Sequence, residues 1–211
     1  IDETILEQAE EDASVVRYTY SMTYGEAGKI ENAEEIEHSV IVVTDFFGNK
    51  TTQTVYNTYD ITDNGSPKII KSITVSVGDN LDGSTTVSLS KVEYSYTERG
   101  QSITLGEDDT IAATGVLNEV KDGTITIVEL ILISRHVDRI EVLQHIAAGV
   151  FGEDVGAISY TEDVFGNYTV TSVENRYTND FGIESIDGRI FKVHEAETKV
   201  LGSHNIDGST S

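Results

Sequence analysis

The chain of 211 residues contains no cysteine, no tryptophan and a single proline. Without cysteine it has no disulfide framework, no thiolate zinc site and no cysteine nucleophile. Long apolar runs are also missing, since the most apolar stretch, residues 125–133, is interrupted by Glu129. A helix that spans a bilayer needs about 20 apolar residues, so this stretch is predicted to be a strand of the core.

Basic residues are scarce. Lys and Arg number 14 against 37 Asp and Glu, which gives a formal net charge of −23. Nucleic acids and anionic membrane surfaces are bound through clusters of Lys and Arg, so we expect no nucleic-acid partner and no membrane insertion. Such acidity is also typical of proteins that stay soluble in concentrated salt, and the sequence does not separate that habitat from the use of calcium.

Strand-forming residues are abundant, because Val, Ile and Thr supply roughly a third of the chain, a composition that favours pleated, half-buried surfaces. We therefore predict an all-β fold of two related antiparallel units, arranged as a sandwich or an extended sheet. Two short helices are expected in addition, one at the N-terminus and one inserted in the second unit. The N-terminal helix is predicted over residues 1–15, where apolar side chains recur at helical spacing.

Two hairpins are predicted in the first unit. Residues 39–47 and 50–59 flank Gly48-Asn49, a pair that favours a two-residue turn. Such a turn would place Val43 opposite Thr54 and Val42 opposite Val55. Residues 68–77 and 84–96 form the second predicted hairpin. In its second strand, Ser84, Thr86, Ser88 and Ser90 alternate with Val87 and Leu89, which predicts one polar and one apolar face.

A helical pattern follows the apolar stretch in the second unit. Over residues 135–148, Val137, Ile140, Leu143 and Ala147 fall at helical spacing, and Gly149 stands where a glycine commonly ends a helix. We therefore expect one short helix there, within an insertion of about residues 105–155.

An internal repeat is the strongest signal in the sequence. Residues 45–59 and 163–177 are identical at eight of fifteen positions without a gap. Tyr-x-Tyr pairs precede both copies, and Asp-Gly-Ser-Thr follows both. We therefore divide the chain into an N-terminal segment (1–15), a first β unit (16–90) and a second β unit (91–211). The second unit closes on its Asp-Gly-Ser-Thr, which suggests a longer array or end-to-end stacking of copies.

These motifs resemble the tyrosine-aspartate (YD/Rhs-type) repeats of large secreted bacterial proteins. The matching pieces are Tyr18-Thr19-Tyr20, Tyr59-Asp60 and the Asp-x-Phe-Gly-Asn motifs at residues 45–49 and 163–167. The resemblance covers about a third of the chain, and the units here are far longer than those of the family. It implies an extracellular β-repeat scaffold and supplies no catalytic residues.

Three groups of residues resemble ligand sites: the histidines, two segments rich in Asp, Asn and Gly, and a glycine-containing loop. His136 and His145 fall on opposite sides of the predicted helix, and His38, His194 and His204 are isolated, so no metal site is predicted through histidine. Residues 60–65 and 79–83 concentrate Asp, Asn and Gly, which fits either ordinary turns or a bound calcium ion. Residues 25–29 resemble a phosphate loop but lack its spacing and its Ser or Thr.

Sugar binding is a further alternative. The pairs Tyr18/Tyr20 and Tyr94/Tyr96 each lie on one strand face and fit either a sugar-stacking platform or packing within the sheet, and we favour packing. Glycosylation sequons occur at Asn49, Asn64 and Asn167. No catalytic residues are assigned and no enzyme is predicted. A hydrolase with acids in residues 153–163 is a minor alternative, because loops on repeats often carry function.

The expected function is structural. We predict a subunit or segment of an extracellular filament, surface layer or adhesin stalk, whose copies associate by pairing of β-strands. The alternative is a calcium- or carbohydrate-dependent adhesion module, with glycans or calcium as partners. Because each chain carries a charge of −23, lateral assembly is expected to need salt or divalent cations.

Overall fold

The computed structural model describes residues 13–210 except 24, 26, 64, 101, 106–108, 113, 151–154, 182–188 and 206. The predicted N-terminal helix lies almost entirely outside these residues. Its last position, Val15, belongs to a strand, β1, so the predicted helix cannot extend over it.

The all-β prediction is confirmed, with two helices in the described part of the chain. The elements are β1 (Val15–Tyr20), β2 (Ile30–Glu37), β3 (Ser39–Thr44), β4 (Lys50–Ile61), β5 (Pro67–Asp79), β6 (Thr85–Tyr96), β7 (Ser102–Leu105), β8 (Asp109–Ala112), β9 (Leu117–Asp122), α2 (Ile131–Ser134), α3 (Ile140–Val150), β10 (Ala157–Glu162), β11 (Tyr168–Phe181) and β12 (Arg189–His204). Neither helix is long and apolar enough to cross a membrane.

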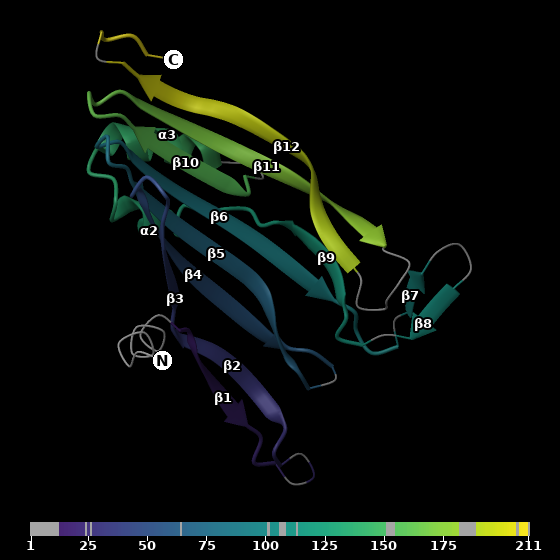
Figure 1. Ribbon diagram of the computed structural model, residues 1–211. Helices are drawn as coiled ribbons and strands as arrows, with labels where there is room; N and C mark the ends of the chain where they lie inside the picture. Colours follow the sequence, from purple (N-terminus) through teal and green to yellow (C-terminus); the bar gives the residue numbers. More distant parts are fainter. Residues whose placement is uncertain are drawn as a thin grey trace.

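One large antiparallel sheet dominates the molecule (Figure 1). Its strand order is β12-β11-β10-β6-β5-β4-β3, with β9 paired to the second half of β6, beyond the end of β10. β1–β2 and β7–β8 form separate two-stranded sheets. The boundary predicted between the two β units, after residue 90, falls inside β6, so the sheet runs through both repeats without interruption.

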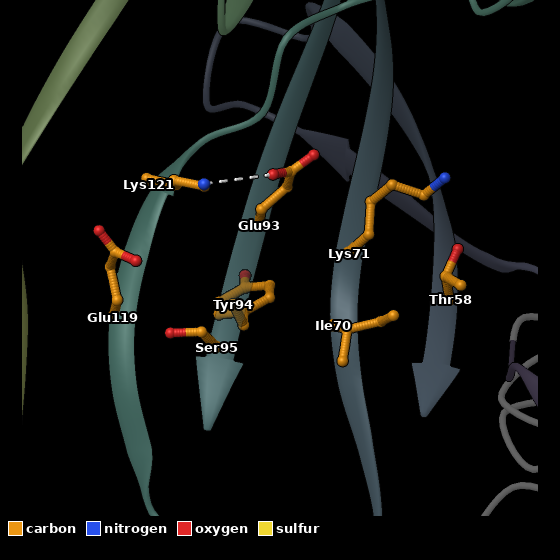
Figure 2. Close-up of a pocket in the computed structure, with 8 residues that line it drawn as sticks. All are labelled: Thr58, Ile70, Lys71, Glu93, Tyr94, Ser95, Glu119 and Lys121. Carbon is orange, nitrogen blue, oxygen red and sulfur yellow. Dashed lines mark ion pairs between the residues drawn. The ribbon is translucent and has the colours of Figure 1, made fainter. Parts of the chain in front are cut away.

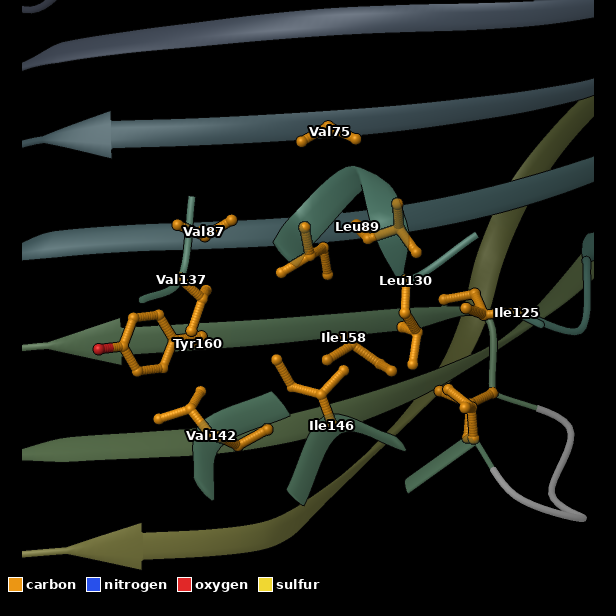
Figure 3. Close-up of a cluster of buried hydrophobic side chains, with 14 of the residues drawn as sticks. Val75, Val87, Leu89, Ile125, Leu130, Val137, Val142, Ile146, Ile158 and Tyr160 are labelled. Carbon is orange, nitrogen blue, oxygen red and sulfur yellow. The ribbon is translucent and has the colours of Figure 1, made fainter. Parts of the chain in front are cut away.

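The hydrophobic core lies between one face of this sheet and the two helices (Figure 3). Val87 and Leu89 on β6 and Ile158 on β10 are fully buried there, against Ile133 of α2 and Ile146 of α3. Burial of each such side chain stabilises the fold by about 1.5–3 kcal/mol. The predicted alternation in β6 is therefore confirmed, because Val87 and Leu89 face the core while Thr86, Ser88 and Ser90 face the other way.

The apolar stretch 125–133 was correctly placed in the core but is not a strand. Ile125, Leu130 and Ile133 are buried, whereas Ile127 and Val128 are exposed. Residues 127–130 form turns that lead into α2. Glu129 explains the turn, because its carboxylate accepts a hydrogen bond from Thr126 N–H at 2.8 Å.

The inserted helix begins later than predicted, at Ile140 instead of Arg135. Its buried residues are Val142, Ile146, Gly149 and Val150, while Ile140 is exposed, so the predicted apolar face was partly wrong. Gly149 does not end the helix. A Cβ at this position would lie 2.1 Å from the side chain of Leu201, so the glycine lets β12 pack closely against α3.

The hairpin of β3 and β4 has a different register from the one predicted. Val43 pairs with Thr51 and Val42 with Thr52, three residues away from the predicted partners. Gly48-Asn49 is not the centre of the turn, because the turn spans residues 45–49 and is organised by Asp45. The second predicted hairpin, β5–β6, is confirmed, with its turn at residues 80–84.

Candidate functional site

The two copies of the repeat fold into the same hairpin, β3–β4 in the first and β10–β11 in the second. In the first turn, Asp45 N–H donates to the carbonyl of Asn49 at 3.0 Å and Gly48 N–H donates to the carbonyl of Asp45 at 3.0 Å. The turn at residues 163–167 repeats both bonds, at 2.9 and 3.0 Å. Gly48 and Gly166 have φ of 92° and 84°, which residues with a side chain rarely adopt.

The aspartates of these turns are fully engaged in holding them. The Asp45 carboxylate accepts hydrogen bonds from Phe47 N–H, Asn49 N–H and Asn49 Nδ2, between 2.7 and 2.9 Å. Asp163 makes the equivalent three bonds. The hydrogen bond from the neighbouring Asn side chain, followed by those from backbone N–H groups, lowers the pKa of both aspartates.

A carboxylate also closes each hairpin at its other end. In β4, the N–H of Asn57 lies beyond the last residue paired with β3, and it donates to Glu35 Oε2 at 2.6 Å. In β11, the matching Asn175 lies beyond the last residue paired with β10 and donates to Asp122 Oδ2 at 2.5 Å. Asparagine occupies this position in both copies of the repeat, and the shared hydrogen bond to a carboxylate is a physical reason for it.

The outer edges of the two hairpins differ. β10 is paired on both sides, with β11 on one and β6 on the other. Among the described strands, β3 is paired with β4 alone and is the last strand of the sheet (Figure 1). Its side chains Ile41, Val42 and Val43 are 46%, 46% and 51% exposed, and the strand carries no charged residue.

Backbone groups on this edge point away from the sheet. In an antiparallel pair of strands, hydrogen-bonded and non-hydrogen-bonded residue pairs alternate. Residues 45 and 49 form a hydrogen-bonded pair, so the backbone groups of Val43, Ile41 and Ser39 bond to β4. The N–H and C=O groups of Val40, Val42 and Thr44 therefore face outwards. On β10 the equivalent residues Ile158, Tyr160 and Glu162 lie opposite Leu89, Val87 and Thr85 of β6. We call the outward side of β3 the free edge.

A groove lies elsewhere, on the sheet surface formed by β4, β5, β6 and β9 (Figure 2). It has a volume of about 430 Å³ and is lined by Thr58, Ile70, Lys71, Glu93, Tyr94, Ser95, Glu119 and Lys121. Lys121 Nζ lies 3.8 Å from Glu93 Oε2. Two lysines and two glutamates thus line the groove, and among the described residues none of its three hydroxyl groups is hydrogen-bonded to a base that would activate it.

A buried ion pair ties the insertion to β6. Lys91 Nζ donates to the carbonyl of Thr124 at 2.7 Å and lies 3.2 Å from Glu129 Oε1, and the Lys91 side chain is 8% exposed. Burial raises the pKa of Glu129, but the hydrogen bond from Thr126 N–H and the contact with Lys91 outweigh it and lower the pKa overall. Because each charge has a partner, the pair is compatible with burial.

The tyrosine pairs are not brought together. Tyr18 and Tyr20 are exposed on β1, in the small sheet, whereas Tyr94 and Tyr96 lie on β6. Tyr96 is part of the packing, since its hydroxyl donates to the carbonyl of Ile69 at 3.0 Å.

Two of the histidines, His145 and His204, lie against the same ring, that of Tyr168, and the other described ones are apart. His136 precedes α3, His145 within α3 lies tilted against Tyr168 with ring centroids 6.2 Å apart, and His38 lies beside Tyr56. His204 stacks on the ring of Tyr168, with ring centroids 5.8 Å apart. The side chain of His194 lies outside the described residues. Within the described part of the chain, no three His, Asp or Glu side chains gather as a metal site.

Aspartates of the two acidic loops accept hydrogen bonds from backbone N–H groups. Asp82 Oδ1 accepts from Ser84 N–H at 2.8 Å, and Asp63 Oδ2 accepts from Arg99 N–H at 2.6 Å, while Asn64 lies outside the described residues. Of residues 25–29, Gly28 and Lys29 belong to the turn between β1 and β2, where both bond to Ser21. Asn49 and Asn167, the described sequon asparagines, donate to the aspartates of their own turns. Of the acids in residues 153–163, Glu153 and Asp154 also lie outside.

Comparison of the chain with protein-family models, curated proteins and solved structures found no match. Functional inference therefore rests on the geometry of the described residues, in which the difference between the two hairpin edges is the feature that most needs an explanation.

Proposed function

We propose that the chain is a structural β-repeat unit that is joined to further copies by addition of a β-strand to the free edge of β3. In this role it would form part of an extracellular filament, surface layer or adhesin stalk. The resemblance to YD/Rhs-type repeats supports the same class of protein. The observation that carries the proposal is that β10, the repeat equivalent of β3, has its outer edge filled by β6.

The composition of β3 supports strand addition. Soluble proteins usually protect an edge strand with Lys, Pro, a bulge or a covering element. β3 has neither Lys nor Pro in its sequence Ser-Val-Ile-Val-Val-Thr and no bulge in its pairing with β4, although about a quarter of the whole chain is charged. An uncharged, β-branched edge strand favours pairing with another strand through backbone hydrogen bonds.

The pairing of β6 with β10 supplies the expected register. Leu89 lies opposite Ile158 and Val87 opposite Tyr160. Transferred to the equivalent positions of the first hairpin, these pairs place an incoming leucine opposite Val40 and an incoming valine opposite Val42. The added strand would run antiparallel to β3 and have the alternating pattern of residues 84–92.

A labelled peptide with the sequence of residues 84–92 tests this directly. We expect it to bind the intact chain, as measured by fluorescence anisotropy, and to lose binding to a Val42→Pro variant. Proline at position 42 removes an outward N–H while leaving the hydrogen bonds to β4 in place. Val42→Thr, which keeps the N–H and a β-branched side chain, is the matched control and should bind normally.

Two results would contradict the proposal. One is the absence of binding to the wild-type chain, and the other is equal binding to wild type and Val42→Pro. A peptide with proline in place of Val87 checks that binding uses the backbone, since it should not compete.

Net charge sets the conditions of assembly. Two chains that each carry −23 repel each other over a distance of about 8–10 Å at physiological ionic strength. Strand addition between whole chains is therefore expected to be favoured by salt, and low ionic strength or removal of divalent cations should loosen the assembly.

A further inference from the structure

The large sheet has a second face, opposite the helices and the core. On this face the side chains of the strands from β3 to β12 form three rows of seven. The rows are Val43-Thr51-Gly78-Thr86-Thr161-Thr169-Ser203, Ile41-Gln53-Ser76-Ser88-Ser159-Thr171-Val200 and Ser39-Val55-Thr74-Ser90-Ala157-Val173-Thr198. We call these 21 positions the hydroxyl face, because 13 of them are Ser or Thr.

No position of the hydroxyl face is charged. Since 24% of the chain is Asp, Glu, Lys or Arg, about five charged residues would be expected among 21 positions. The contrast with β2 is clear, where four of eight residues are glutamate. None of the 21 residues is buried within the described chain, so burial in its own fold does not explain the absence of charge.

The size of the face is suited to a protein partner. Seven strands spaced by about 4.8 Å span about 29 Å, and three rows cover about 14 Å along the strands. With the width of the side chains included, this is about 700 Å² for each copy, or about 1,400 Å² for two. Specific interfaces between proteins bury about 1,200–2,000 Å² in total.

We propose that a second copy of this chain packs on the hydroxyl face, with the two sheets face to face across a twofold axis. At the axis of a twofold interface each side chain meets its own copy, which disfavours charged side chains at the centre. A hydroxyl group both donates and accepts hydrogen bonds, so it can pair with another hydroxyl. The face is also a broad surface on which two chains of −23 can approach without charges in contact.

Other partners fit less well. The 21 positions include no aromatic side chain on which a sugar ring could stack and no Lys or Arg that could bind a phosphate. Their side chains are small, which favours close approach of a second flat sheet. This contact uses a sheet face, so it is independent of strand addition at the free edge, which uses backbone groups.

Sedimentation equilibrium of the intact chain at 0.15 M salt tests the proposal. We expect the wild type to associate, and we expect at least tenfold weaker dimerisation through the hydroxyl face for Ser88→Glu and Ser88→Lys, since Ser88 lies in the central row. Gln144→Glu, on the exposed side of α3, adds the same charge as Ser88→Glu and should dimerise like the wild type. Val42→Pro should also dimerise normally, because it alters only strand addition.

The lysine variant separates packing from overall charge. If dimerisation were limited only by net charge, Ser88→Lys would strengthen it, and this result would overturn the proposal. A wild-type chain that stays monomeric, or assembly that is lost in Val42→Pro but unchanged in both Ser88 variants, would overturn it as well. Circular dichroism establishes that the variants are folded, and Thr171→Lys, in the same row, replaces Ser88→Lys if that variant does not fold.

Discussion

The hairpins β3–β4 and β10–β11 share a turn, a register and an asparagine closed by a carboxylate, yet they have different surroundings. The second hairpin is enclosed by β6 and covered by helices, and its Ile158 is fully buried. The first lies at the border of the sheet, with three exposed aliphatic side chains on β3. The comparison teaches that a repeated sequence determines the local hairpin, whereas neighbouring elements determine which of its surfaces are available.

Comparison of the two copies also distinguishes contacts fixed by the local sequence from contacts made by distant segments. The aspartates of the turns bond within five residues, and both copies reproduce these bonds. The carboxylates that close the far ends come from unlike segments, Glu35 on β2 and Asp122 on β9. Two different elements thus supply an acceptor for the equivalent asparagine N–H in each copy. Any acceptor suffices, because a backbone N–H that has no partner strand needs some other group to accept its hydrogen bond.

The largest difference between the hairpins is expected when the equivalent side chain is shortened in each. Ile158→Ala removes a fully buried side chain from β10 and should lower the free energy of unfolding by about 2–5 kcal/mol. Val40→Ala shortens the side chain at the equivalent position of β3, which is only partly buried, and should cost about 1 kcal/mol or less. Urea denaturation followed by circular dichroism measures both. Equal losses would show that the two hairpins are buried alike.

A smaller effect is expected from the carboxylates that close the hairpins. Glu35→Ala and Asp122→Ala each leave an asparagine N–H without its acceptor, and each should cost about 1–3 kcal/mol in unfolding free energy. Glu34→Ala, at an exposed neighbouring position, serves as the control and should be close to neutral. If only one of the two variants is destabilised, the carboxylates do not have equivalent roles.

The smallest effect concerns the aspartates of the turns at low pH. Hydrogen bonds lower the pKa of Asp45 and Asp163 below the ordinary value of 3.8, so their contribution to stability is present above that value and is lost as pH falls through the lowered pKa. Between pH 5 and pH 2 the urea midpoint of the wild type should therefore fall further than that of Asp45→Asn or Asp163→Asn. A variant whose midpoint falls as far as that of the wild type would show that its aspartate makes no such contribution.

Much of the sheet could be predicted from the sequence. The alternation in β6 correctly identified Val87 and Leu89 as core residues, and the repeat correctly indicated that two hairpins are alike. The register of β3–β4 was wrong because the turn was centred on Gly48-Asn49. The signal was present in Asp45 at the start of the turn and Gly48 three residues later, which is the pattern of a type I turn followed by a bulge.

Other features could not be predicted from local patterns. Residues 125–133 have the composition of a core strand but form turns and α2, because Ile125 N–H bonds to the distant carbonyl of Val155 and Glu129 pairs with Lys91. Arg139 is drawn to Glu162, at 2.5 Å, and to the carbonyl of Gly166, which accounts for the late start of α3. Nor does any sequence spacing reveal that Glu35 and Asp122 serve equivalent asparagines, 22 and 53 residues away.

Residue-resolved amide hydrogen exchange at Val42 and Tyr160, equivalent positions on β3 and β10, tests strand addition most directly. In the dispersed chain, Val42 N–H should exchange rapidly and Tyr160 N–H slowly, because only Tyr160 lies opposite a strand on its outer side. On assembly, or on saturation with the peptide of residues 84–92, Val42 should become protected to a similar degree. Assembly that leaves the exchange of Val42 unchanged would contradict the proposal that copies are joined at this edge.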